Sequence, residues 1–451
     1  MIVCKFGGTS MADRRAMARC AAIIADNQEA RVSVVSATAG TTEQLNTLIA
    51  LAVTDKQEQV AQGLAVLRER HIAFALEVGL NDSEMTALKA ILERVENRCL
   101  GVMLLAEASL AARDGILGLG EHMAAILFAR ALEEAGVRSR VQAAGQIMRT
   151  DTHFGAAEPQ IDTIRKLCGE HLLPFLTDRH VVIAGFVGAN AAGVATTLGR
   201  GGSDYSAALL AEAIDATAVH IWTDVPGIAS TDPNLLPSAK TIPEINFSEA
   251  AELAVFGARV LHPATLWPAI RENIPVYVAS SREPEKGGTW IRPKSQNQEP
   301  GPRAIAVRNQ QTLITLTSLR MLHVSGFLAS VFQILAEHRI SVDMLTTSEI
   351  SISLTLDQPV RFTPEIQAEL ARFAQIRIEE NLTLVALVGN QLNSTPGLAA
   401  QIFELLAGIN VRVFCGGASD HSLAFLLHAQ QAHQAVTRIH RVLLEDEEVY
   451  A

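Results

Sequence analysis

Short apolar runs alternate with helical stretches through the first two thirds of the chain. The runs with the length and composition of buried strands are Ile2–Phe6, Val32–Ser36, Val181–Val187, Val219–Trp222 and Ile274–Ala279, the last being the predicted final strand of this region. Between these runs, apolar residues recur at helical spacing, as Met17, Ala21 and Ile24 do. This alternation predicts an α/β fold with an open, mainly parallel sheet sandwiched by helices.

Two further stretches subdivide the chain. From about residue 55 to 113 the pattern is helical throughout, which predicts an insertion of two to four helices that acts as a lid or scaffold. Residues 294–303, KSQNQEPGPR, are polar and hold two prolines, which predicts a linker.

The region after this linker contains an internal repeat. With a shift of 71 residues, Leu313–Leu316 falls on Leu384–Leu387, and Gly326–Ala329 falls on Gly397–Ala400 without a gap. Each copy reads strand, glycine loop, helix, strand, strand, helix. This order predicts two βαββαβ-like units and favours a paired regulatory module over a second enzyme.

The two copies differ at two acidic positions. The first copy carries Asp343 and Glu349, where the second has Phe414 and Asp420. The carboxylates of the first copy either hold a cationic ligand or are ordinary surface acids.

Composition narrows the possible functions. A chain of 451 residues suggests two to three domains. The net charge of −11 and the lack of a basic cluster argue against nucleic-acid binding, although local cations can still hold phosphorylated ligands. The five cysteines form no C-x-x-C pair and lie in or beside apolar runs, which favours buried, reduced thiols. No apolar run approaches about 18 residues and MIVCKFGG lacks a signal-peptide core, so we expect no membrane span and a cytoplasmic location.

The first candidate for chemistry is KFGGTS, at Lys5–Ser10, where the first predicted strand ends. Backbone N–H groups of a Gly-Gly turn can approach an anion, and Lys5 can neutralise it. The lysine precedes the glycines, so the segment is not a P-loop. The alternative is a plain strand-to-helix turn, although an unpaired lysine inside a strand would be costly.

The second candidate is TTLGRGGSDY, at Thr196–Tyr205, which precedes an apolar helix. Its glycines allow a ligand to approach the backbone, Arg200 adds a fork of donors and Asp204 adds an acceptor. The alternative is a tight glycine turn before a core helix. Small and hydroxyl-bearing residues also follow the second predicted strand, at 37–42, where Thr42 is either a ligand contact or a helix N-cap.

Two carboxylates complete the candidates. Glu121 follows Gly120 at the start of an apolar helix, either as a first-turn residue favoured by the helix dipole or as a partner for a substrate ammonium. Asp224 follows Thr223 at a strand end, either as a turn residue or as a contact for a nucleotide or its metal.

Together these elements resemble the aspartokinases. The shared motifs are KFGGTS, Gly120-Glu121, TTLGRGGSDY, WTDVPGI at Trp222–Ile228 and FGARVLHP at Phe256–Pro263, followed by the duplicated tail. The chain looks most like the monofunctional, lysine-sensitive type, since it ends after the second repeat. The resemblance implies an amino-acid kinase fold followed by two ACT units. It also implies transfer of a phosphoryl group from Mg²⁺-bound ATP to the 4-carboxylate of L-aspartate, the first step of lysine, threonine and methionine (diaminopimelate) biosynthesis.

The resemblance implies a role for each matching position. Lys5 and Asp204 match catalytic positions. The substrate-binding positions are Thr42, Glu121, Phe186, Arg200 and Ser203. The ATP-binding positions are Lys5, Gly7, Gly8, Ser10, Thr223, Asp224, Ala229, Asn234 and Arg259, the last three replacing the usual tyrosine, arginine and lysine. The positions for inhibitory L-lysine are Met321, Val324, Asp343, Thr347, Ser348 and Glu349, with Val324 in place of a serine. No residue is assigned as a metal ligand, because Mg²⁺ is carried by the nucleotide.

The implied domains are a catalytic domain at 1–293, a linker at 294–307, and ACT units at 308–380 and 381–451 that can be intertwined. ACT units usually pair through their sheets, so we expect a homodimer or tetramer, with L-aspartate, ATP and L-lysine as small-molecule partners. One alternative is a related kinase that acts on glutamate, N-acetylglutamate or UMP, against which the ACT pair and Glu121 argue. The other is a non-catalytic amino-acid sensor, for which the loss of Lys5, Arg200 or Asp204 would be expected.

Overall fold

The computed structural model describes residues 1–257, 263–295, 299–321, 326–356 and 362–445. Two compact units emerge from it, each built from more than one segment. The first unit comprises Met1–Ile228, Pro243–Phe247 and Val260–Ser295, and the second comprises Ala229–Ile242, Ser248–Arg259 and Gln296–Ala451.

The first unit is built on a sheet with the strand order β3-β4-β2-β1-β7-β9-β10-β8 among the described residues. The strands are β1 Ile2–Phe6, β2 Ala30–Val35, β3 Ser139–Gln142, β4 His180–Ala184, β7 Ala218–Thr223, β8 Glu244–Asn246, β9 Val276–Ser280 and β10 Gly288–Arg292. Neighbouring strands are parallel from β3 to β9, and only β10 runs antiparallel to β9. The predicted mainly parallel sheet is confirmed.

The prediction that Ile274–Ala279 forms the final strand of this region is wrong. Strand β10 follows β9 in the chain and pairs with both β9 and β8. Its sequence, GTWIR, alternates buried and half-buried positions, so it lacks the continuous apolar run by which the buried strands were recognised.

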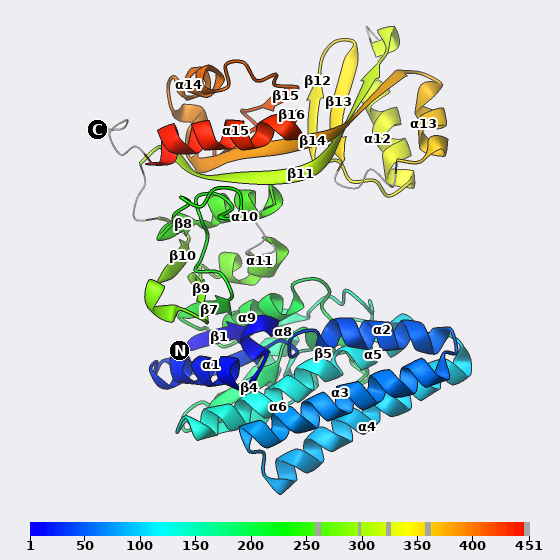
Figure 1. The fold of residues 1–451 in the computed structure, drawn as a ribbon, viewed down its shortest axis with the longest axis vertical. Helices are drawn as coiled ribbons and strands as arrows, with labels where there is room; N and C mark the ends of the chain where they lie inside the picture. Colours follow the sequence, from blue (N-terminus) through cyan, green and yellow to red (C-terminus); the bar gives the residue numbers. More distant parts are fainter. Residues whose placement is uncertain (258–262, 296–298, 322–325, 357–361, 446–451) are drawn as a thin grey trace. The chain divides into compact units, whose positions relative to one another are not determined.

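Helices cover both faces of this sheet (Figure 1). The helices of the first unit are α1 Arg14–Ala25, α2 Thr41–Val53, α3 Gln57–Val78, α4 Asp82–Leu105, α5 Leu110–Leu117, α6 Leu119–Glu134, α7 Ala144–Ile147, α8 Ile161–His171, α9 Gly202–Ala213 and α11 Pro263–Arg271. Helices α1 and α6 lie on one face, while α9 lies on the other and packs against α8 and α11. The insertion predicted at 55–113 is confirmed as helical, and its helices α3 and α4 pack against the outer side of α6.

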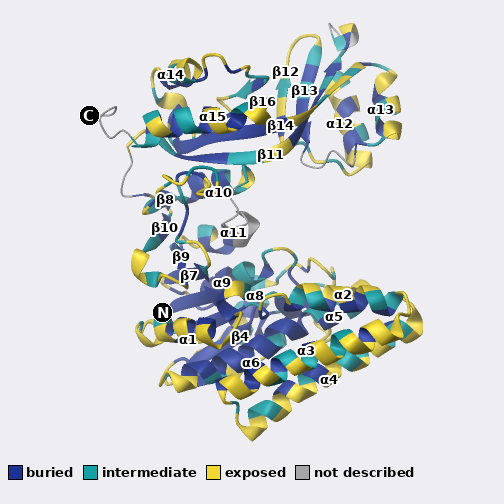
Figure 2. Cartoon of the chain, viewed as in Figure 1, coloured by how far each residue is buried: buried dark blue, intermediate teal, exposed yellow. Residues whose placement is uncertain are grey.

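One stretch of the described chain, Leu110–Glu134, is long and apolar enough to cross a membrane by length and composition alone. It comprises α5 and α6, and 78% of its most apolar window is buried inside the unit. Phe128 of α6, for example, packs on Phe6 of β1 with ring centroids 5.2 Å apart, and α6 is buried along most of its length (Figure 2). This burial is typical of a core helix.

The second unit contains an antiparallel sheet with the order β12-β13-β11-β14-β16-β15. Its strands are β11 Gly301–Thr317, β12 Met344–Thr347, β13 Ser351–Leu356, β14 Gln375–Asn390, β15 Val413–Cys415 and β16 Ser422–His428. Its helices are α10 Phe247–Val255, which begins one residue before the unit, α12 Phe327–Glu337, α13 Pro364–Ala371, α14 Leu398–Leu405 and α15 Ala429–His440. Each predicted repeat has its own hydrophobic core, one around Ile314 and Leu335 and one around Val385 and Ile402.

The two repeats share strands β11 and β14. Ala304–Arg308 of β11 pairs with Leu384–Val388 of β14, whereas Thr312–Thr317 of β11 pairs with β13. Ile305 accordingly belongs to the core of the second repeat and Ile314 to the core of the first. Strand β11 begins at Gly301, inside the stretch predicted as a linker, because its first half serves as a strand of the second repeat.

Segments 229–242 and 248–257 belong to the second unit, although the predicted catalytic domain includes them. The Ile305 N–H donates to the Ser230 carbonyl at 2.7 Å, and Ser230 Oγ lies 2.8 Å from His440 Nε2 on α15. The Arg303 guanidinium donates to Glu249 at 2.9 Å. These contacts explain why the compact units cut across the predicted boundaries.

Candidate active site

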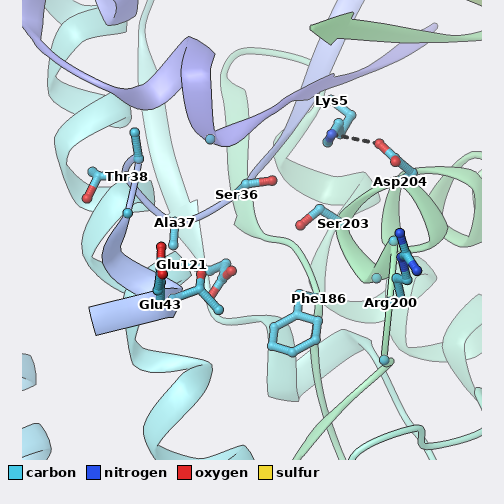
Figure 3. A pocket seen from close by; sticks show the side chains of 17 residues that line it. Lys5, Ser36, Ala37, Thr38, Glu43, Glu121, Phe186, Arg200, Ser203 and Asp204 are labelled. Carbon is cyan, nitrogen blue, oxygen red and sulfur yellow. Dashed lines mark ion pairs between the residues drawn. The ribbon is translucent and has the colours of Figure 1, made fainter. Parts of the chain in front are cut away.

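A cavity of about 520 Å³ lies in the first unit, where β1 and β2 end at their carboxyl termini (Figure 3). Loops after parallel strands and the first turn of α9 meet there, as expected for a ligand site in an α/β sheet. The residues that line it are Lys5, Gly8, Ser36, Ala37, Thr38, Ala39, Gly40, Thr42, Glu43, Glu121, Phe186, Gly199, Arg200, Gly201, Gly202, Ser203 and Asp204.

Lys5 reaches the cavity from the middle of the sheet. Its strand, β1, lies between β2 and β7, and its side chain is 11% exposed. The ammonium Nζ lies 2.7 Å from Asp204 Oδ1, in the first turn of α9 (Figure 3). This ion pair offsets the cost of burying the lysine and holds its charge at the cavity wall.

The loop before α9 supplies a second cation. Gly199 and Gly201 have φ angles of 76° and 72°, so both hold the left-handed conformation that glycine adopts without strain. Between them, Arg200 is exposed, and it forms no ion pair or hydrogen bond with any residue in the described part of the chain. Lys5 and Arg200 are the two cationic side chains among the described lining residues, and Arg200 is the one that has no carboxylate partner there.

Phe186 forms the floor between these elements (Figure 3). Its φ angle is 67°, and its N–H donates to Ser206 Oγ on α9 at 2.9 Å. A Cβ atom on Gly202 would lie 2.6 Å from the Phe186 ring, so glycine is required at that position. Phe186 and the start of α9 are therefore held as one rigid wall.

Glu121 faces the cavity from the first turn of α6. Its side chain is 4% exposed, and its Oε2 atom has no hydrogen-bond partner among the described residues. Burial raises the pKa of Glu121 to about 7, although backbone hydrogen bonds from Glu121 and Ala37 oppose the shift. A buried carboxylate with an unpartnered oxygen is suited to pair with a ligand ammonium.

The cavity brings together eight of the predicted catalytic, substrate and ATP residues, namely Lys5, Gly8, Thr42, Glu121, Phe186, Arg200, Ser203 and Asp204. Gly7 and Ser10 lie beside it, where the Gly7 N–H donates to the Trp222 carbonyl at 3.1 Å and Ser10 Oγ lies 2.7 Å from Ser281 Oγ. Gly7 therefore ties the end of β1 to β7, and Ser10 ties the turn after β1 to the residue that follows β9.

The remaining predicted ATP residues do not line the cavity. Thr223 ends β7, and its hydroxyl donates to Asp224 Oδ1 at 3.2 Å. Ala229 and Asn234 belong to the second unit, where the Asn234 N–H donates to Asp232 at 2.9 Å. Arg259 lies outside the described residues.

Sequence reasoning missed three polar lining residues, Ser36, Thr38 and Glu43. The pattern that pointed to them was the strand end at 36 followed by small and hydroxyl-bearing residues. Gly40, the N-cap of α2, has a left-handed φ angle of 77° and turns the chain from this loop into the helix. That turn sets which residues on either side of it face the cavity.

The predicted lysine positions lie around β12 in the second unit. Asp343, just before the strand, pairs with Arg308 at 2.6 Å. Thr347 ends the strand, the Ser348 hydroxyl lies 2.8 Å from that of Ser351, and Glu349 is exposed at the following turn. Met321 packs against the core of the first repeat. Val324 lies outside the described residues.

Within the described residues, no group of three or more His, Cys, Asp or Glu side chains is placed to hold a metal ion. The five cysteines are free, and four of them are buried. Burial raises the pKa of Cys4, Cys20 and Cys168 to about 12, as expected for inert core thiols.

Residues 1–280 match the amino acid kinase family, and residues 314–359 and 385–443 match the ACT domain. The chain is 45% identical to lysine-sensitive aspartokinase 3 of Escherichia coli over 457 residues, which span 99% of each protein. The chain belongs to the aspartokinase family. The predicted amino-acid kinase fold with two ACT units, and the predicted kinase class, are thereby confirmed.

Two solved structures of E. coli aspartokinase III extend the match. The complex with aspartate and ADP superposes with a TM-score of 0.84 at 43% identity and covers 99% of this chain and 100% of that one. The complex with lysine and aspartate superposes with a TM-score of 0.85 at 44% identity and covers 98% of this chain and 99% of that one. The aspartokinase likeness therefore extends over both compact units of the chain.

Proposed function

We propose that this aspartokinase transfers the γ-phosphoryl group of ATP to the 4-carboxylate of L-aspartate in the cavity between Lys5, Glu121 and Arg200. The observation that carries the proposal is the placement of three complementary charges around one cavity: a free guanidinium, a buried carboxylate and a lysine. L-aspartate presents the matching groups, an α-carboxylate, an ammonium and a second carboxylate that reacts. The E. coli relative, which binds aspartate and ADP, supports this assignment.

Each charged group has a separate role in binding. Arg200 forks onto the α-carboxylate, and Glu121 pairs with the ammonium. Ser203 and Thr42 donate hydroxyl hydrogen bonds to the substrate, and Phe186 closes the cavity beneath it. These contacts fix the direction in which the 4-carboxylate points.

The chemical step requires alignment and charge neutralisation. The 4-carboxylate is ionised at neutral pH, so one of its oxygens attacks the γ-phosphorus without a general base, and ADP leaves. Lys5, oriented by Asp204, neutralises charge on the phosphoryl oxygens, and the N–H group of Gly8 approaches them. A Mg²⁺ ion carried by the nucleotide supplies further neutralisation when it is bound.

The nucleotide is proposed to extend from this turn toward the end of β7, where Thr223 and Asp224 lie. Ala229, Asn234 and Arg259 are retained as proposed nucleotide positions by resemblance alone. We retain the proposed division into a catalytic domain at 1–293, a linker at 294–307, whose residues 301–307 form the first half of β11, and ACT units at 308–380 and 381–451. We also propose a cytoplasmic location.

A substrate panel tests the proposed function. Purified protein is expected to form ADP from ATP when L-aspartate is added, and not with L-glutamate, N-acetyl-L-glutamate or UMP. Turnover with one of those three acceptors but not with aspartate would assign the chain to another reaction. Aspartate binding without any turnover would favour a sensor.

Replacing Glu121 with glutamine is expected to stabilise the unliganded protein at pH 8 and to change it little near pH 4. The folded pKa of about 7 lies above the ordinary value of 4.5, so folding favours the protonated carboxyl group. That contribution is fully present below pH 4.5 and is lost as the pH rises through 7. The gain at pH 8 is roughly 3 kcal/mol, to be measured by denaturant unfolding at both pH values.

The same variant tests the proposed ammonium contact. In the natural protein, KM for aspartate should rise as the pH falls below about 7, because Glu121 must be ionised to pair with the ammonium. Glu121→Gln should raise KM by about tenfold or more and flatten this dependence. Glu134→Gln, at the exposed end of the same helix, is the control. An unchanged pH profile in the Glu121 variant would contradict the assignment.

We further propose that L-lysine inhibits the enzyme at the first ACT unit, as the lysine complex of the E. coli relative suggests. Asp343 lies just before β12 and Glu349 two residues after it. We propose that both carboxylates contribute to this site, and that the protein forms a homodimer or tetramer that pairs through the ACT sheets.

Replacing Glu349 with glutamine is expected to raise the lysine concentration for half-inhibition by about tenfold or more, because a charge-assisted contact is lost. Turnover without lysine should not change. Asp420→Asn, at the equivalent position of the second repeat, is the matched control and should keep normal inhibition. Equal effects of the two variants would argue against a site specific to the first unit.

A further inference from the structure

We propose that Arg70 and His71 of α3 are positioning residues that hold the loop between β2 and α2, residues 36–40, and the first turn of α2 in their aspartate-binding conformation. The proposal rests on the function proposed above. It gives the helical insertion a role in aspartate binding, because no residue of α3 or α4 takes part in the catalytic scheme. Neither side chain lines the cavity. Both act on it through two threonine hydroxyl groups.

Arg70 and His71 converge on these hydroxyl groups from one turn of α3. The Arg70 guanidinium donates to Thr38 Oγ1 at 2.8 Å and also to Thr41 Oγ1. The Thr38 and Thr41 hydroxyl oxygens are 2.6 Å apart, and His71 Nε2 lies 3.2 Å from Thr38 Oγ1. Thr38, Thr41 and His71 are buried, and Arg70 is half-buried.

The direction of each hydrogen bond in this network follows from the protonation state of the His71 ring. Burial lowers its pKa to about 4, so the ring is neutral, and its Nδ1 donates to the Leu67 carbonyl at 2.9 Å. Nε2 then carries no hydrogen and accepts from the Thr38 hydroxyl. Thr38 in turn accepts from Arg70 and from the Thr41 hydroxyl. The four side chains thus form a closed network with a single arrangement of donors.

The charge of Arg70 distinguishes this network from ordinary packing. Arg70 pairs with no carboxylate in the described part of the chain, and burial lowers the pKa of its guanidinium. Arg68, two residues earlier, shows the usual alternative, because it pairs with Glu96 at 2.9 Å on the surface. Placing an unpaired cation against hydroxyl groups costs desolvation energy. The cost is offset where the neighbouring cavity receives anionic ligands.

The network reaches the substrate contacts through the loop backbone. Gly40 has a φ angle of 77° and lies next to Arg70. A Cβ atom added to Gly40 would lie 3.9 Å from Arg70 Nη1. Ala37 packs closely against Gly120, because a Cβ atom added to Gly120 would lie 3.0 Å from the Cβ atom of Ala37. The Ala37 backbone also hydrogen-bonds to the Glu121 carboxyl group. Movement of this loop would therefore shift Thr42 and Glu121 together.

Hydrogen exchange and steady-state kinetics on one set of variants test the proposal. Arg70→Gln and Thr41→Val should each speed exchange of residues 36–45 in the unliganded protein by about tenfold and raise KM for aspartate by a similar factor, with kcat changed much less. Arg70→Lys should be intermediate, and Arg68→Gln should behave as the natural protein. The double variant Arg70→Gln/Thr41→Val should be no worse than either single variant, because both remove the same link.

Two results would overturn the proposal. One is unchanged exchange of residues 36–45 in both single variants. The other is KM effects that multiply in the double variant, which would make Arg70 an independent contact of the substrate. The exchange measurement does not depend on turnover. If the natural protein showed no aspartate-dependent activity, the proposed function would be rejected, but hydrogen exchange would still show whether Arg70 holds the loop.

Discussion

Replacing Lys5 with alanine is expected to lower kcat by about 10³-fold while the protein stays folded. Lys5 is the cation that reaches the cavity from the sheet, and its Nζ is aimed by the ion pair with Asp204 at 2.7 Å. Its charge matters most when negative charge accumulates on the transferring phosphoryl group, so kcat should fall more than KM rises. Steady-state kinetics with both substrates varied will measure this division.

The Lys5 variant needs two controls. Lys5→Met keeps the length of the side chain without its charge and should be as slow as Lys5→Ala. Lys286→Ala removes an exposed lysine that pairs with Glu283 and should leave turnover unchanged. Near-normal kcat in a folded Lys5→Ala protein would remove Lys5 from the catalytic scheme.

Replacing Arg200 with glutamine is expected to raise KM for aspartate by about 100-fold and to lower kcat by a smaller factor. Arg200 is exposed at the cavity and has no partner among the described residues, so its guanidinium is free for the α-carboxylate. Arg200→Lys should recover only part of the affinity, because an ammonium cannot form the bidentate contact. Titration of initial rate against aspartate at saturating ATP will give both constants.

The matched control for Arg200 is Arg165→Gln, which removes an exposed arginine that pairs with Asp215 at 2.8 Å. It should leave KM unchanged. If Arg200→Gln instead raised KM for ATP and left that for aspartate unchanged, Arg200 would belong to the phosphate side of the cavity and the aspartate would need another anchor.

The sequence predicted the parts of the fold and site that depend on local pattern. Buried strands give continuous apolar runs, so the central parallel strands could be recognised, and glycine loops at their ends pointed to Lys5 and Arg200. Strand β10, with its alternating residues, could not be distinguished from a loop in the same way. The repeat of 71 residues predicted two similar units, as the two separate cores confirm.

Long-range pairing could not be predicted from local pattern. Nothing in KSQNQEPGPR shows that Gly301 begins a strand that pairs with Asn390. The neighbours of Arg70 were equally hidden, because the charge run LRERH has the composition of a solvated helix face. Only the fold shows that one of its arginines turns inward to Thr38 and Thr41.

Identifying the phosphorylated product tests directly whether this enzyme phosphorylates the 4-carboxylate of L-aspartate. The purified protein is incubated with Mg²⁺, ATP and L-aspartate in hydroxylamine, which captures an acyl phosphate as its hydroxamate, while ADP is followed in parallel. We expect aspartyl hydroxamate in equal amount to ADP, with both reduced by L-lysine. ADP formation without hydroxamate, or no aspartate-dependent ADP at all, would contradict it.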